Sequence, residues 1–308
     1  MSKIRWKKKE RRGVWSLSDN IIHCTMLVLL ALLSIACLYP FLIVVSSSFQ
    51  SQENLYNYGY RVFAKEYTLD TYKIIFKDAG MLIDSYVVTI ITTVLTTLIG
   101  VAATASCGYV MSRRDYRYCK ILSFYVFFTM LFSGGMVPSY ILISKWLGLK
   151  DSIWALILPL CVSAWNLLLM KGFFASIPTS LIESAKLDGA GEFRILISIV
   201  APLSKPAIAT IGLFEILSSW NEYMNSLLYI ENERLVKLQY LLMRIMKNIE
   251  FLNTPEAMQY GMATAGMEVP TLGMRMAMCV LAAGPIVIVF PFFQKYFTKG
   301  ITLGGVKG

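Results

Sequence analysis

Two glutamates, Glu215 and Glu222, lie in a long apolar stretch between Pro206 and Ile230. They are seven residues apart, so a helix would place both on one side. A charge in the middle of a bilayer costs several kcal/mol unless it faces protein or water. The pair therefore predicts an inward-facing polar surface, which the seryl and asparaginyl neighbours extend: Ser218, Ser219, Asn225 and Ser226. Such a surface could line a path for a polar solute or hold helices together.

A second group with explicit spacing begins after Pro178. Ser180 and Glu183 have the spacing of a capping box, which predicts a helix start near Ser180. Gly189 can end that helix in the left-handed conformation, and Gly191 allows a further turn. The apolar residues of this short helix share one face: Leu181, Ile182 and Ala185. A partner's cleft would cover that face, although a helix lying on the membrane surface is an alternative.

The elements that position these groups are membrane-spanning helices. The chain of 308 residues is 56% apolar and 16% charged, with a mean hydropathy of +0.58. A helix of roughly 20 residues crosses a hydrocarbon core. Six stretches are long enough: residues 20–52, 85–112, 121–144, 152–170, 206–230 and 276–294. We expect an all-α integral membrane protein, and the first stretch is too long for a cleaved signal peptide.

Basic residues set the expected orientation. Seven Lys and Arg residues precede the first span, and four more crowd the short segment 113–120. Both segments should therefore lie in the cytoplasm, together with the C-terminus. The net charge of +10 thus reflects topology, and its position beside apolar spans argues against nucleic-acid binding. The six cysteines lie in or beside spans without a CxxC pair, so neither disulfides nor a metal site is expected.

The segments outside the spans carry weaker signals. The basic leader 1–19 suits an interfacial anchor or a solvated tail. The outer segment 47–84 contains five tyrosines, typical of a packed cap or a docking surface. Gly134, Gly135 and Pro138 predict a kink in the third span. An apolar pattern from Leu235 to Ile249 predicts a short interfacial helix.

The loop containing Glu183 also resembles a known family. Glu183, Ala185, Gly189, Ile199 and Pro202 match the E-A-A-x3-G-x9-I-x-L-P signature of the membrane subunits of ABC importers. Ser184 and Ala201 depart mildly from that pattern. The surrounding stretches, at residues 134–138, 188–191 and 202–206, resemble the carbohydrate-uptake branch, particularly permeases for larger oligosaccharides. The ending, residues 300–308, resembles the tail of the second permease of maltose-type importers.

This resemblance implies a type I ABC importer permease with a coupling loop at 176–202. The residues expected to contact the ATPase are Ser180, Leu181, Ile182, Glu183, Ala185, Asp188, Gly189, Gly191 and Pro202. In the tail, Gly304, Gly305 and Lys307 would reach between the ATPase subunits. Sugars are bound by hydrogen bonds and aromatic stacking, so the candidate pathway residues are Glu215, Ser219, Trp220, Asn221, Glu222 and Tyr223. Trp165 and Asn166 form a similar pair that is more typical of helix packing.

The expected organisation is a leader at 1–19, a first transmembrane helix at 20–46, an outer segment at 47–84, a permease core at 85–297 and a cytoplasmic tail at 298–308. The resemblance implies a second permease, two ATPase subunits, an extracytoplasmic sugar-binding lipoprotein and membrane lipid as partners. The chain itself is expected to have no catalytic residue and no cofactor, with ATP and Mg bound by the ATPases. Two rivals stay open: an ABC permease for a non-sugar solute, and an ion-coupled transporter that uses Glu215 as a proton carrier.

Overall fold

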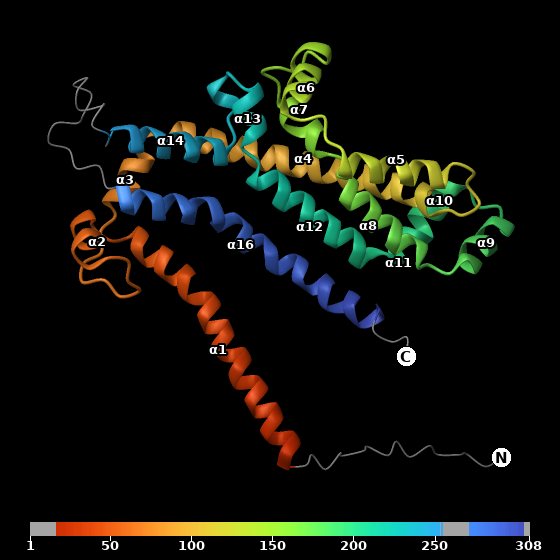
Figure 1. Ribbon diagram of the computed structural model, residues 1–308, viewed down its shortest axis with the longest axis horizontal. Helices are drawn as coiled ribbons and strands as arrows, with labels where there is room; N and C mark the ends of the chain where they lie inside the picture. Colours follow the sequence, from red (N-terminus) through yellow and green to blue (C-terminus); the bar gives the residue numbers. More distant parts are fainter. Residues whose placement is uncertain (1–16, 253, 255–270, 305–308) are drawn as a thin grey trace.

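The computed structural model describes residues 17–252, 254 and 271–304. Every regular element in this part of the chain is helical, apart from one isolated bridge between Gln50 and Tyr67. Figure 1 shows an elongated bundle, with α2, α3 and α14 at one end and α9 and α10 at the other, from which α1 diverges and α6, α7 and α13 project. The α-helices are α1 Leu17–Ser48, α2 Gln52–Tyr58, α3 Asp70–Ile75, α4 Ala79–Ser112, α5 Cys119–Leu131, α6 Met136–Ile141, α7 Ile153–Ile157, α8 Ala164–Ala175, α9 Thr179–Leu187, α10 Glu192–Ile195, α11 Ala201–Leu203, α12 Lys205–Asn221, α13 Met224–Tyr229, α14 Leu238–Leu252 and α16 Thr271–Gly304.

Helix α4 is the central helix of the bundle. It packs against α8 and α12, and α12 in turn packs against α16. The buried face of α4 is small and polar at intervals of three or four residues: Ser85, Thr89, Thr92, Thr96, Gly100, Thr104 and Gly108. Small residues let helices approach closely within a membrane, where packing contacts drive association because lipid is as apolar as leucine. The sequence of α4 therefore explains its central place.

Among the described residues, three helices are long and apolar enough to cross a membrane, and the count rises to six if each of three bent pairs is one span. The continuous spans are Ile21–Ser48, Ala79–Ser112 and Leu272–Gln294. The third predicted span bends by 113° between α5 and α6, where Gly135 has a φ of +86°. The kink expected from Gly134, Gly135 and Pro138 is confirmed, and it is a reversal of direction.

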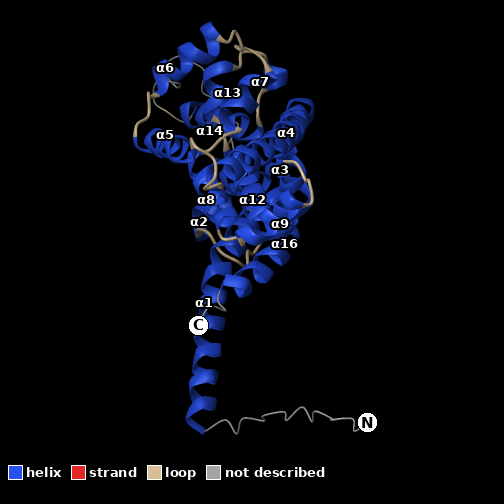
Figure 2. Cartoon of the chain, turned by 90° about the vertical axis from the view of Figure 1, so that its right-hand side faces the viewer, coloured by secondary structure: helices blue, strands red, loops and turns tan. Residues whose placement is uncertain are grey.

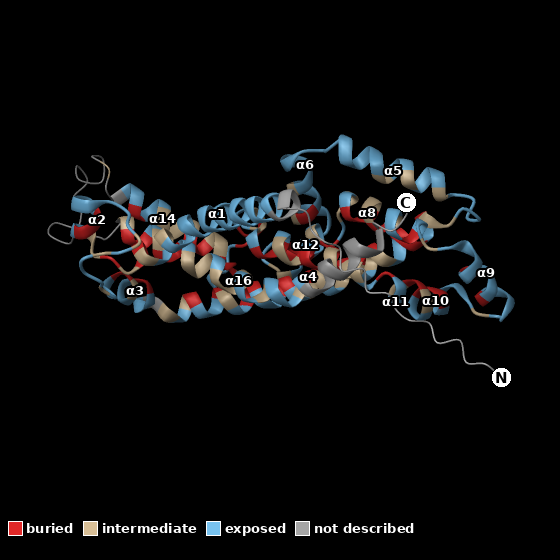
Figure 3. Ribbon diagram, turned by 90° about the horizontal axis from the view of Figure 1, so that it is seen from below, coloured by how far each residue is buried: buried red, intermediate tan, exposed pale blue. Residues whose placement is uncertain are grey.

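Helices α1 and α5 carry long exposed apolar surfaces, although α1 contacts α16 and α5 contacts α8. The apolar side chains along α1 are more than half exposed over most of its length, and no residue of α5 is buried. Figure 2 shows α1 extending away from the other helices, and Figure 3 shows its surface and that of α5 as almost entirely exposed. Long apolar surfaces of this kind are stable only against lipid or another protein.

The end of the bundle that holds α2 and α3 is an ordered cap. The buried Gln50 side chain donates to the Arg61 carbonyl (2.8 Å), and Asn54 donates to the Glu66 carbonyl (3.3 Å). Tyr56 and Tyr67 stay exposed on the same cap. Beside it, the apolar pattern from Leu235 to Ile249 forms α14, whose buried side packs into the largest core cluster. The expected helix is confirmed there.

Candidate functional site

Helix α9 ends as its sequence predicts. Gly189 has a φ of +80°, the left-handed conformation that glycine adopts without steric cost. Its amide donates to the Lys186 carbonyl (3.0 Å), and the Ala190 amide donates to the Ala185 carbonyl (2.9 Å). These two bonds form a Schellman motif, which satisfies the last carbonyls of the helix. Gly191 has an ordinary φ of −72° and open space around its Cα, so no turn requires glycine there.

The start of α9 differs from the prediction. The helix begins at Thr179 with Pro178 as its N-cap residue, and no side chain makes a capping hydrogen bond. The expected capping box of Ser180 and Glu183 is therefore wrong. Pro178 supplies a rigid, extended entry to the helix, which places Ser180 inside the first turn, where its hydroxyl is no longer in the capping position.

The apolar face of α9 is split between two environments. Ile182 and Ala185 are buried in this chain's own core, with Tyr109, Met170 and Ile195. The expectation that Ile182 and Ala185 fill a partner's groove is therefore wrong for this conformation. Leu181 is half exposed, and Leu187 is 89% exposed. Because α9 already uses one stripe to hold itself to α4 and α8, these two leucines form the apolar surface available to a partner.

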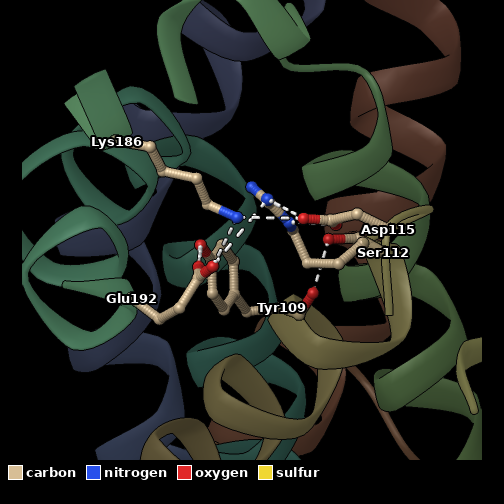
Figure 4. Close-up of polar contacts among 6 residues, drawn as sticks. Tyr109, Ser112, Asp115, Lys186 and Glu192 are labelled. Atoms are coloured by element: carbon tan, nitrogen blue, oxygen red, sulfur yellow. Dashed lines mark hydrogen bonds and ion pairs between the residues drawn. The ribbon is translucent and has the colours of Figure 1, made fainter. Parts of the chain in front are cut away.

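A charge cluster connects α9 to its neighbours; we define it as Tyr109, Arg113, Asp115, Lys186 and Glu192 (Figure 4). The Arg113 guanidinium donates to both Asp115 oxygens, from Nε at 3.0 Å and from Nη2 at 2.7 Å. Lys186 Nζ lies 2.9 Å from Asp115 Oδ2 and 2.7 Å from Glu192 Oε1. The hydroxyl of Tyr109 donates to Glu192 Oε2 at 2.5 Å. The cluster thus joins α4, the segment after it, α9 and α10.

The cluster stays charged at neutral pH. Hydrogen bonds from Arg113 and Lys186 hold the pKa of Asp115 well below its usual range. Hydrogen bonding to Glu192, and then to Asp115, raises the pKa of Lys186. Asp115 and Glu192 are about half exposed, so each ion pair stabilises the fold by only about 0–1 kcal/mol. Geometry is the more important contribution, because the bidentate arginine fixes the direction of the Asp115 carboxylate.

A second polar site lies midway along α12. Glu215 is 1% exposed, and its Oε1 accepts a hydrogen bond from Asn166 Nδ2 of α8 at 2.7 Å. Its carboxyl group lies against Gly100 of α4, where an added Cβ would be 3.3 Å from Glu215 Cδ. A cavity of about 320 Å³ opens beside it, which we call the Glu215 cavity. Its lining consists of Leu160, Ser163, Trp165, Asn166, Phe214, Glu215 and Ser218.

Comparison with known proteins connects these two sites. Residues 106–303 match the family model of the binding-protein-dependent transport system inner membrane component. That match covers the α9 segment, the Glu215 cavity and most of the helical body. The chain belongs to this family. It is thus a multi-pass protein of the bacterial plasma membrane and a permease subunit of the ABC transport systems.

Individual relatives of this permease agree over nearly its whole length. The polygalacturonan/rhamnogalacturonan transport system permease protein YtcP of Bacillus subtilis is 40% identical over 91% of this chain and 96% of its own. The maltodextrin transport system permease protein MdxG of the same organism is 30% identical over 92% and 96%, respectively. Among solved structures, a bacterial ABC transporter involved in the import of the acidic polysaccharide alginate has a TM-score of 0.75 and 30% identity, covering 92% of this chain and 99% of its own.

The permease does not carry the predicted polar stripe as one helical face. Helix α12 ends at Asn221, and α13 begins at Met224 with the Glu222 carboxylate accepting from the Asn225 amide (2.7 Å). Glu222 therefore caps a new helix. The seven-residue spacing could not reveal this end, because the Glu222 carboxylate accepts from a backbone amide in the first turn of the next helix instead of continuing the face of α12.

Trp220 and Ser219 also differ from the prediction. Trp220 is 4% exposed in the core and donates from Nε1 to the Ala282 carbonyl of α16 (2.9 Å), so its ring has no face open to a sugar here. Ser219 is fully buried and does not line the Glu215 cavity. Asn221 and Tyr223 are accessible. Conversely, the Glu215 cavity is lined by Trp165 and Asn166, which the sequence analysis assigned to helix packing. The feature of the sequence that could have indicated this role is the repetition of a Trp-Asn pair in two predicted spans.

The remaining predicted residues belong to the coupling loop, which the structure describes, and to the tail, most of which it does not. Glu183 and Asp188 are exposed on and after α9, and Pro202 lies in α11, just before α12. Gly304 is the last residue of α16, whereas Gly305 and Lys307 lie outside the described residues. The leader up to residue 16 also lies outside them.

Proposed function

We propose that this permease is one of two membrane subunits of an ATP-driven importer for an oligosaccharide. The observation that carries the proposal is the Glu215 cavity, a polar site placed midway along α12 within an otherwise apolar body. The functions of the relatives, which include polygalacturonan/rhamnogalacturonan and maltodextrin transport, support a saccharide as the solute. Because the alginate importer and YtcP both serve the transport of acidic polysaccharides, an oligosaccharide of uronic acids is the first substrate to test.

In this proposal, the solute path runs along the Glu215 cavity. Trp165 is 60% exposed and offers a ring face for stacking on a sugar. Asn166, Glu215 and Ser218 offer donors and acceptors for hydroxyl groups. Asn221 and Tyr223 continue the accessible polar surface beyond the end of α12. The other predicted pathway residues would support the path without contacting the solute: Ser219 and Trp220 through packing, and Glu222 by capping α13.

The same proposal assigns ATP chemistry to other subunits. Two ATPase subunits would bind ATP and Mg and dock against the exposed leucines of α9, together with Ser180, Glu183 and Asp188. This chain would contribute no catalytic residue. A second permease would cover part of the apolar surface of α1 and α5, lipid would cover the rest, and an extracytoplasmic sugar-binding lipoprotein would dock at the α2 and α3 cap. Both chain termini would then lie in the cytoplasm.

Reconstitution tests the function directly. The permease is co-expressed with its neighbouring permease, ATPase and binding-protein genes, and uptake of galacturonate oligomers and maltodextrins is measured in proteoliposomes. We expect ATP-dependent uptake of at least one of these saccharides. An uncoupler should leave the rate of that uptake unchanged. Uptake that needs an ion gradient and no ATP would refute the proposal.

A conservative variant of Glu215 separates the importer from the ion-coupled rival. Glu215→Gln keeps an oxygen that accepts from Asn166 but cannot release a proton. We expect this variant to retain most of the uptake, whereas Glu215→Leu, which leaves Asn166 unpaired, should lose most of it. Loss of uptake in Glu215→Gln with normal membrane levels would favour a proton carrier.

A further inference from the structure

Lys186 occupies the junction of three segments at the α9 end of the permease. Its ammonium group lies 2.9 Å from Asp115 Oδ2, which belongs to the segment after α4, and 2.7 Å from Glu192 Oε1 on α10. Figure 4 shows the Lys186 side chain extending from α9 toward both carboxylates. The side chain is 38% exposed. One cation therefore bridges two acids that are 77 residues apart in the sequence, since 192 − 115 = 77.

The bridge adds direction to an apolar contact. Ile182 and Ala185 hold α9 to the core that contains Tyr109 of α4. Apolar burial is non-directional, so this contact alone would not fix the position of α9 along the surface of the core. Arg113 is only 13% exposed and fixes the Asp115 carboxylate from behind with two hydrogen bonds. Lys186 thereby ties α9 to a fixed point at the end of α4.

Helix α4 leads from this fixed point to the Glu215 cavity. It is a continuous helix from Ala79 to Ser112 and packs against both α8 and α12. Gly100, which lies against the Glu215 carboxyl, is twelve residues from Ser112, or about 18 Å at 1.5 Å per residue. A rigid helix in close-packed surroundings transmits a displacement along its axis.

We propose that Lys186 is a positioning residue that transmits displacement of α9 to α4, and so couples ATPase closure to the Glu215 cavity. The inference rests on the proposed function, because it assumes that α9 is moved by an ATPase. It assigns Lys186 to a link inside this chain and not to a contact with the ATPase. Removal of Lys186 should therefore leave the ATPase bound but transport uncoupled from hydrolysis.

The test uses the complete importer in proteoliposomes, with a galacturonate trimer as the probe. Three variants are compared with wild type: Lys186→Met, Lys186→Arg and Lys205→Met, the last changing an exposed lysine at the first residue of α12. The measured quantities are the ATPase subunits that co-purify and the number of trimers imported per ATP hydrolysed. We expect Lys186→Met to lower that ratio by about fivefold or more with ATPase binding unchanged. Lys186→Arg should restore most of it, and Lys205→Met should match wild type.

A second variant tests whether the contact to Asp115 carries the effect. Asp115→Asn should lower the ratio similarly, and combining it with Lys186→Met should cause little further loss, because residues acting through one contact are non-additive. A wild-type ratio in Lys186→Met overturns the proposal. Loss of the ATPase from Lys186→Met also overturns it, since Lys186 would then be a docking contact. Failure of the proposed function would be visible in the wild-type complex, as absence of ATPase or of ATP-dependent uptake.

Discussion

At the scale of single residues, Gly189 has the left-handed backbone conformation on which we expect coupling to depend. Its φ of +80° is costly for any other residue, whereas no atom lies within 4 Å of an added Cβ. Gly189→Val should therefore act through backbone strain of about 1–3 kcal/mol and not through a clash. We expect normal membrane levels but reduced uptake, because the exit of α9 is displaced; immunoblotting and uptake measure the two.

Gly191 provides the matched control for that prediction. It lies two residues away, also in open space, but at an ordinary φ of −72°. Gly191→Ala should support uptake close to wild type. If Gly189→Val transports normally, the left-handed end of α9 does not matter for coupling. If both variants fail equally, the loop is sensitive to side chains in general.

At the scale of elements, the crossing of α4 with its neighbours depends on small residues. A Cβ on Gly100 would lie 2.9 Å from the Cys161 carbonyl oxygen and 3.3 Å from the Glu215 carboxyl carbon. Backbone cannot move aside easily, so Gly100→Ala should separate α4 from the segment before α8 and disturb the Glu215 cavity. We expect a loss of stability of about 1–3 kcal/mol, measured as a lower melting temperature of the detergent-solubilised protein.

Gly108, two turns further along α4, is the comparison. Its added Cβ would lie 2.9 Å from Cγ and 3.1 Å from Cβ of the buried Met170, and its nearest backbone neighbour, the Lys171 nitrogen, would be 3.4 Å away, in place of a carbonyl oxygen at 2.9 Å. Methionine has several rotamers and adapts to small changes. Gly108→Ala should therefore lower the melting temperature less than Gly100→Ala does. The reverse order would show that the contact of Gly100 with the Cys161 carbonyl is not the tighter restraint.

At the scale of the whole molecule, α9 presents two exposed leucines, Leu181 and Leu187, that we expect a partner to cover. Leu187 is 89% exposed, and Figure 1 shows its helix, α9, at the end of the molecule opposite α2 and α3. Leu187→Asp should leave folding and membrane insertion intact but reduce co-purification of the ATPase subunits, because it puts a charge into a contact that is apolar in our proposal. Affinity purification of a tagged permease measures the bound ATPase.

Leu187→Met keeps the apolar character and should retain the ATPase. Ile182→Ala should behave differently again, because Ile182 is buried in the chain's own core and its truncation should lower the melting temperature. Undiminished ATPase binding by Leu187→Asp would exclude this leucine from the docking surface and leave Leu181 as the apolar residue to test.

The order of the spans, the left-handed end of α9 and the kink near Gly135 were all predictable from the sequence. Each depends on local physics: the free energy of burying an apolar stretch, and the freedom of glycine at positive φ. The family signature around Glu183 and Gly189 is similarly local, since its residues lie within one loop.

The tertiary structure alone decided which residues face one another. It placed Ile182 and Ala185 inside the core, turned Trp220 toward α16, and brought Asn166 to Glu215 across 49 residues and Tyr109 to Glu192 across 83. Helical periodicity says that residues share a face but not whether that face meets lipid, a partner or the chain itself. That choice depends on packing between distant segments, so both the Glu215 cavity and the Lys186 bridge became visible only in three dimensions.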